Sequence, residues 1–284
     1  MSNVRAAAVA GMFYPGAPGA LAASVRALLD AAPRVAAADA PVPKALIVPH
    51  AGYIYSGPIA ARAYARLVPA RTRVRRVVLL GPVHRMPIHG LALPGADSFI
   101  TPLGAVPVDV EAAARLRALP QVCRSDPAHA LEHSLEVQLP FLQIVLEEFT
   151  LVPLAVGKAR AHQVAEVIEA VWGGPETLIV VSSDLSHYHR YDEAVEIDRS
   201  TADEILALAD TLDHEQACGA TGINGFALCA RRHGLEPELI DLRNSGDTAG
   251  DRSRVVGYAA FAFSGKKPEV VAARPADVEE TVDA

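Results

Sequence analysis

The chain has 284 residues, of which 51% are hydrophobic, and a formal net charge of −7. Its length allows one large α/β domain or two smaller ones, and its acidic balance argues against nucleic acid as a partner. No apolar run of about 18 residues is present, so we expect no membrane span. Three cysteines and the absence of a signal-peptide pattern predict a reduced, cytoplasmic protein.

Strand and helix patterns alternate along the chain. Strand-like runs are expected at Lys44–Val48, Arg76–Leu80, Gly90–Leu93, Thr150–Val156, Glu176–Ser182, Glu238–Arg243 and Val255–Phe263. Helical periodicity is expected at Ala20–Ala31, Pro58–Leu67, Val110–Ala118, Leu135–Glu148, Ala161–Val171, Asp192–Ala209 and Gly222–His233. The runs RRVVLL and ETLIVV are almost continuously apolar, which is typical of strands covered on both faces.

These patterns predict a single layered α/β domain over residues 1–264, with a mainly parallel central sheet flanked by helices. After Ser264 the composition turns to Lys, Pro, Glu, Asp and Ala. Residues 265–284 are therefore predicted to form a poorly ordered C-terminal tail.

Three histidines follow the ends of predicted strands. His50 follows ALIVP, His84 follows VVLLGPV, and His187 follows LIVVSSDLS. Because ligands of open α/β sheets bind at the carboxyl ends of strands, we expect the three imidazoles to share a crevice. Asp184 begins the third loop and is expected to accept a hydrogen bond from an imidazole there. Neutral imidazole is a common metal ligand, although a single histidine is more often a hydrogen-bonded loop residue, and no HExxH or CxxC spacing is present.

Two further segments leave alternatives open. Cys218 lies just before a predicted helix, where a thiolate would be stabilised and could bind a metal, but it could equally be a small apolar turn residue. In ALEHSLEVQLPFL, Ser134 or the acidic residues, Glu132 among them, could serve the following helix as cap and dipole partners. Alternatively, His133 could lie beside the crevice as an acid–base group or a substrate contact. The aromatic turn AGMFYPG either packs against the core or lines a pocket.

Taken together, six motifs resemble the MEMO family, whose bacterial and archaeal members are often called AmmeMemoRadiSam system protein B. The motifs are AGMFYP, VPHAGYIYSG, LLGPVH, EHSLEVQLPFL, SSDLSHY and ACGATGI, and they run in order from about Ala10 to Phe263. The resemblance implies a fold similar to the class III extradiol dioxygenases, the LigB-like group, which hold non-haem iron with two histidines and a glutamate.

In the MEMO family the corresponding site has two histidines and a cysteine, which match His50, His84 and Cys218 here. His187, His133 and Asp184 match further polar residues around that site and are the catalytic candidates that the resemblance implies. A thiolate in place of a carboxylate changes the softness of the site, so iron is the first expectation, with copper or zinc as alternatives.

Three functions follow from these expectations. The first is a redox enzyme of the extradiol-dioxygenase type, acting on an unidentified small molecule in the metal crevice. The second is a non-catalytic module that binds a metal or a peptide and works with radical-SAM and AMMECR1-like proteins. The third and lesser one is a zinc hydrolase, since two histidines, a cysteine and water form an open zinc arrangement.

Overall fold

The computed structural model describes residues 3–33 and 41–265 of the chain. Within them, nine strands form one sheet in the order β10-β12-β2-β9-β3-β8-β4-β7, with β11 also paired to β12, and β1, β5 and β6 form a second sheet. The strands are β1 Val4–Arg5, β2 Ala45–Val48, β3 Arg76–Pro82, β4 Leu91–Leu93, β5 Ser98–Thr101, β6 Gly104–Pro107, β7 Val122–Arg124, β8 Thr150–Val156, β9 Thr177–Ser182, β10 His187–His189, β11 Leu235–Asn244 and β12 Val255–Gly265.

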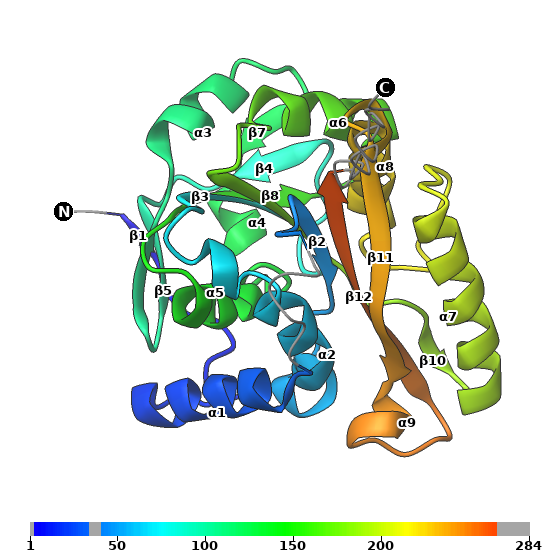
Figure 1. Cartoon of the computed structure of the whole chain (residues 1–284). Helices are drawn as coiled ribbons and strands as arrows, with labels where there is room; N and C mark the ends of the chain where they lie inside the picture. Colours follow the sequence, from blue (N-terminus) through cyan, green and yellow to red (C-terminus); the bar gives the residue numbers. More distant parts are fainter. Residues whose placement is uncertain (1–2, 34–40, 266–284) are drawn as a thin grey trace, which may run out of the picture.

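Helices cover both faces of the main sheet. The α-helices are α1 Pro18–Ala31, α2 Tyr53–Ala65, α3 Val110–Leu116, α4 Asp126–Ala130, α5 Leu139–Val145, α6 Ala161–Ala170, α7 Tyr191–Leu206, α8 Ala220–Arg232 and α9 Ser245–Thr248. Two 3₁₀ turns are η1 Val68–Ala70 and η2 Glu136–Gln138. In Figure 1, α1, α2 and α5 lie on one side of the sheet, α7 lies on the other, and the β11–β12 hairpin extends beyond the neighbouring strands.

The predicted α/β class is confirmed, and the sheet is mixed. Its four central strands, β2, β9, β3 and β8, are parallel. Antiparallel pairs lie outside them, where β12 meets β2, β10 and β11, and where β4 meets β8. The parallel strands are those that read as continuous apolar runs, because both of their faces are buried.

Alternate side chains of the central strands enter two separate cores. In β2, Leu46 and Val48 pack into the core beneath α1, α2 and α5, whereas Ala45 and Ile47 pack into the core beneath α3, α6, α7 and α8. This is the period-two alternation of a pleated strand. The loops that follow β2, β3 and β9 carry His50, His84 and Asp184, three of the candidate site residues.

Every predicted strand and helix has a counterpart in the structure. The strand β8 has the predicted bounds, most other boundaries shift by a few residues, and the helix expected at Leu135–Glu148 is the 3₁₀ turn η2 followed by the shorter α5. The largest shift is in α2, which was expected from Pro58 but begins at Tyr53, with Pro58 inside it. Most of the predicted C-terminal tail, residues 266–284, lies outside the described residues. Among the described helices, none combines the length and apolar character needed to cross a membrane.

Candidate metal centre

Three neighbouring parallel strands end at one edge of the sheet. β9 lies between β2 and β3, and the three run in the same direction. His50 follows β2, His84 follows β3, and both Asp184 and His187 follow β9. The loops that bear these residues therefore leave the sheet side by side, at the edge where open α/β sheets bind ligands.

Three imidazoles meet at this edge. One ring nitrogen from each of His50, His84 and His133 lies within 4.8 Å of the other two. The His50 ring lies edge-to-face with both others, with centroids 5.2 Å from His84 and 5.4 Å from His133, whereas His84 and His133 stack at 4.6 Å. Burial lowers the pKa of His50 well below its usual range and that of His133 to about 4. Both are therefore neutral at pH 7, the form in which imidazole binds a metal.

The buried carboxylate of Glu132 orients two of these rings. Its Oε1 lies 2.9 Å from Nδ1 of His84 and 3.3 Å from Nδ1 of His133. Burial by itself raises the pKa of Glu132, but the His84 ring and the backbone N–H groups of His84 and Ser134 outweigh it and hold the pKa at about 2. An ionised carboxylate only accepts hydrogen bonds, so Nδ1 of His84 carries the proton and Nε2 is free. Metal-ligating histidines commonly have such a carboxylate partner.

Cys218 lies beside His50. Its Sγ is 3.3 Å from Nε2 of His50 and accepts a hydrogen bond from the backbone N–H of Asp184, also at 3.3 Å. Although α8 begins two residues later, burial raises the pKa of Cys218 to about 12, and the charge of Asp184 adds to the rise. The expected stabilisation of the thiolate by the helix is thus outweighed by burial. A metal that binds here would displace the thiol proton.

Asp184 holds the backbone of His50 and not its ring. The Oδ1 atom accepts a hydrogen bond from the His50 N–H at 2.7 Å, so the expected contact with an imidazole is replaced by a contact with the peptide group. Burial raises the pKa of Asp184 to about 7, although the hydrogen bond from His50 opposes the rise. His187 is half-buried and is not one of the three converging imidazoles. It is followed by Tyr188, an exposed residue with φ of 63°.

The aromatic turn near the start of the chain both packs against this centre and lines a pocket. The rings of Phe13 and His133 lie 4.7 Å apart between centroids, and the Phe13 carbonyl accepts a hydrogen bond from the N–H of Tyr53 at 2.8 Å. Residues 11–15 and 52–55, with two side chains from α1, line a pocket of about 440 Å³. The two readings of AGMFYPG are therefore compatible.

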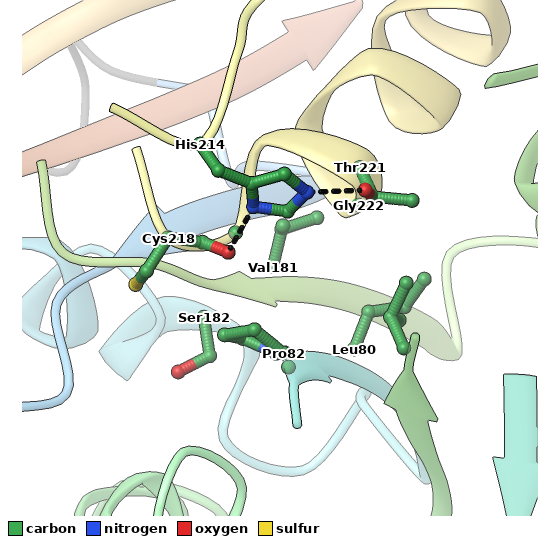
Figure 2. Close-up of a pocket in the computed structure, with 11 residues that line it drawn as sticks. Leu80, Pro82, Val181, Ser182, His214, Cys218, Thr221 and Gly222 are labelled. Atoms are coloured by element: carbon green, nitrogen blue, oxygen red, sulfur yellow. Dashed lines mark hydrogen bonds between the residues drawn. The ribbon is translucent and has the colours of Figure 1, made fainter. Parts of the chain in front are cut away.

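A histidine that the sequence did not single out fixes the turn that bears Cys218. Figure 2 shows His214 between the Cys218 carbonyl, 3.2 Å from its Nδ1, and the Thr221 hydroxyl, 3.1 Å from its Nε2, with the Cys218 sulfur pointing away. A Cβ added at Gly219 would lie 2.6 Å from Cβ of Ser183, so the turn approaches β9 too closely for a larger residue. The cavity beside it is about 10 Å³, which is room for about one water molecule.

Comparison with known proteins identifies the family of the chain. The family model described as Memo-like protein matches residues 5–262. The chain belongs to this family. A MEMO1 family protein of Archaeoglobus fulgidus is 36% identical over 90% of this chain and 97% of its own length. Relatives from Methanopyrus kandleri and Aquifex aeolicus are each 36% identical, over 91% and 92% of this chain and 98% and 99% of their own lengths.

Two contributors to the centre of this Memo-like chain escaped sequence reasoning. The sequence alone suggests only a helix cap or dipole role for Glu132. It suggests only the last residue of a strand for Ser182, whose Oγ lies 2.9 Å from Nδ1 of His50. The adjacent Glu132 and His133 in a segment that meets the sheet edge could have suggested a carboxylate–histidine pair. No local pattern marks Ser182, because its partners are 132 and 48 residues away in the sequence.

Proposed function

We propose that this chain binds one transition-metal ion through His50, His84 and Cys218 and uses it for redox chemistry on a small substrate. Iron is the first choice, with copper and zinc as alternatives. The observation that carries the proposal is the convergence of three imidazole nitrogens within 4.8 Å, one each from the buried His50, the half-buried His133 and the exposed His84. A cysteine sulfur lies 3.3 Å from the His50 ring.

The choice of the third ligand rests on distances and ring directions. At the usual bond lengths of a tetrahedral site, two imidazole nitrogens lie about 3.4 Å apart, and a nitrogen and a sulfur about 3.6 Å apart. The 3.3 Å between Cys218 Sγ and His50 Nε2 is close to the second value. The rings of His84 and His133 stack with an interplanar angle of 26°, so their in-plane lone pairs run side by side. This geometry supports Cys218 as the third ligand and His133 as a neighbouring acid–base group.

The donor set suits a borderline-soft metal. Two imidazoles and a thiolate fit Fe(II), copper or zinc, and three protein ligands leave a position open for substrate. When bound, iron would supply the redox chemistry that the dioxygenase-like fold suggests. All three side chains are held by partners outside the centre: His84 by Glu132, Cys218 by the N–H of Asp184, and His50 by Ser182.

His133, His187 and Asp184 have distinct proposed roles. His133 is neutral because burial lowers its pKa to about 4, so a ring nitrogen is free to take a proton from a bound substrate. Glu132 Oε1, 3.3 Å from Nδ1 of His133, would stabilise the imidazolium that results. Asp184 fixes the backbone of His50. The half-buried His187 would hold or exchange a proton at the rim, and burial keeps its pKa low.

A non-catalytic binding module is the second candidate, and one observation favours it. Met12 and Ile54 are 72% and 69% exposed and both line the pocket beside Phe13. Exposed apolar side chains around a pocket are typical of a surface that meets a partner. Such a partner would be a peptide, with radical-SAM and AMMECR1-like proteins as its proposed sources. A zinc hydrolase is the third candidate, and only the set of two imidazoles and a thiolate supports it.

Metal content after purification without oxygen tests the proposal. We expect near-stoichiometric metal in the wild type and its loss in His50→Ala, His84→Ala and Cys218→Ser. Matched controls are His162→Ala and Cys123→Ser, which remove an exposed imidazole and an exposed thiol and should retain the metal. If His133→Ala lost the metal and Cys218→Ser retained it, His133 and not Cys218 would be the third ligand. No metal in the wild type after reconstitution would overturn the proposal and favour the binding module.

A further inference from the structure

The geometry points to Ser182 and Gln138 as positioning residues that hold His50 in a single tautomer, with the proton on Nδ1 and the lone pair on Nε2. The inference rests on the proposed function only in taking Nε2 of His50 as the ligand atom. The tautomer itself follows from hydrogen bonds among residues that are at most 1% exposed, where water does not compete.

One side-chain hydroxyl and one backbone carbonyl fix the orientation of the Gln138 amide. Its Oε1 accepts a hydrogen bond from the Tyr64 hydroxyl at 2.9 Å. Its Nε2 lies 2.9 Å from the Pro49 carbonyl and 2.8 Å from Oγ of Ser182. A flipped amide would bring two acceptor oxygens together at Pro49, so the nitrogen must face that carbonyl. The second N–H of Gln138 therefore donates to Ser182.

The Ser182 hydroxyl donates its single proton to the Ser134 carbonyl. Its Oγ lies 2.7 Å from the Ser134 carbonyl, and since a carbonyl cannot donate, Ser182 supplies the proton of this bond. A serine hydroxyl has one proton and two lone pairs, and Gln138 occupies one of the lone pairs. The other faces Nδ1 of His50 at 2.9 Å. Nδ1 must then be the donor.

This assignment leaves Nε2 of His50 unprotonated and directed at Cys218 Sγ, 3.3 Å away. His84 reaches the same tautomer through the charged Glu132, whereas His50 reaches it through neutral groups only. The relay begins in α2 with Tyr64, passes through η2, and ends at the last residue of β9. It therefore ties the orientation of the His50 ring to the packing of α2 against Gln138.

The tautomer of His50 can be read in metal-free protein from long-range ¹H–¹⁵N NMR of ¹⁵N-histidine-labelled samples. We expect a protonated Nδ1 and a bare Nε2 in the wild type. In Ser182→Ala the acceptor is gone, and we expect the proton to move to Nε2, where Cys218 Sγ can accept it. Ser134→Ala is the matched control, because it removes an equally buried hydroxyl bonded to the Pro82 carbonyl at 2.8 Å and leaves the Ser134 carbonyl in place. Ser182→Thr keeps the hydroxyl and should keep the wild-type tautomer.

Co²⁺ titration of the same samples without oxygen gives the functional consequence. We expect Ser182→Ala to bind Co²⁺ about 10- to 100-fold more weakly, as is usual when an outer partner of a ligating histidine is lost, and Ser134→Ala to match the wild type. A protonated Nε2 in the wild type, an unchanged tautomer in Ser182→Ala, or a changed tautomer with unchanged affinity would overturn the inference. Because the tautomer is read without metal, failure of the metal proposal shows separately, as wild-type protein that has the expected tautomer and binds no Co²⁺.

Discussion

Glu132 and Glu136 are two buried glutamates, four residues apart in one segment, that hydrogen-bond to different parts of the molecule. Their residues are 1% and 0% exposed. Glu132 accepts hydrogen bonds from the ring and backbone of His84 and from the backbone of His133. Its partners are therefore groups of the candidate metal centre.

Glu136 binds only the N-terminal segment. It pairs with the guanidinium of Arg5 and accepts a hydrogen bond from the Tyr14 hydroxyl. It also accepts backbone hydrogen bonds from Ala8 at 2.7 Å and Val9 at 3.0 Å. Through these hydrogen bonds, the Glu136 carboxylate holds residues 5–14, which include Phe13, against the segment that bears His133.

The difference shows that burial of a charge does not by itself mark a functional residue. Both carboxylates are fully satisfied, as buried charges must be. The two carboxylates differ in their partners. Glu136 accepts from an arginine and from backbone amides that belong to the fold, whereas Glu132 accepts from the His84 ring of the candidate metal centre. Substitution of each residue should therefore change a different measured quantity.

The largest effect on stability is expected for Glu136→Gln. The amide cannot neutralise Arg5, whose side chain is 5% exposed, and removal of one partner of a buried ion pair costs about 3–5 kcal/mol. Urea unfolding measures this loss, with Glu148→Gln as the control because that side chain is 89% exposed. A loss in Glu136→Gln as small as that of the control would remove the distinction between the two glutamates.

The next effect is expected for Glu132→Gln, on metal affinity. A neutral amide is a weaker acceptor for Nδ1 of His84, and the loss of such an outer carboxylate weakens metal binding by about 10- to 100-fold. The cost in unfolding free energy should be smaller than for Glu136→Gln, since no buried cation is left unpaired. Co²⁺ titration and urea unfolding of both variants test this. We expect Glu132→Gln to lose more metal affinity and Glu136→Gln to lose more unfolding free energy. Equal losses in both quantities for the two variants would contradict this expectation.

Local patterns were sufficient to predict the central strands, the longer helices and the edge of the sheet where His50 and His84 lie, but not the short elements β1, β5, β6, β7, β10, α4 and α9. The apolar runs that became β2, β3 and β9 are buried on both faces, so their pattern in the sequence is strong. The early start of α2 was not predictable, because the N–H of Tyr53 is capped by the carbonyl of Phe13, forty residues earlier. Pro58 suggested a later start, since proline is common in the first turn of a helix.

The partners that complete the candidate site were not predictable for the same reason. Glu132 meets His84 across 48 residues, and Gln138 meets Ser182 across 44. Such pairings depend on how segments far apart in the sequence pack against one another, and one sequence carries no signal for them. His50 and His84 could be placed in one crevice because strand ends converge by a general rule, and Cys218 entered the proposed ligand set through the family resemblance. Their hydrogen-bond partners follow no comparable rule.

Asp109 offers a third carboxylate that separates the effect of burial from that of pairing. It also pairs with an arginine, with Arg76 Nε 2.7 Å from its Oδ2, and it caps α3 by accepting from the N–H of Ala112 at 2.9 Å. However, its side chain is 10% exposed and that of Arg76 is 23% exposed, so water reaches both. Burial by itself raises the pKa of Asp109, but the Ala112 N–H and Arg76 outweigh it and lower the pKa overall.

Asp109→Asn should therefore have the smallest effect, about 1 kcal/mol in unfolding free energy at pH 7, as for the loss of a helix cap. Because the folded state lowers the pKa of this carboxyl, its contribution is complete above the unfolded pKa of about 4 and is lost as the pH falls through the folded pKa. The stability difference between wild type and variant should thus shrink below about pH 4, which urea unfolding at several pH values measures. If Asp109→Asn cost as much as Glu136→Gln at pH 7, pairing with arginine and not burial would set the cost, and the contrast drawn between the two buried glutamates would need a different cause.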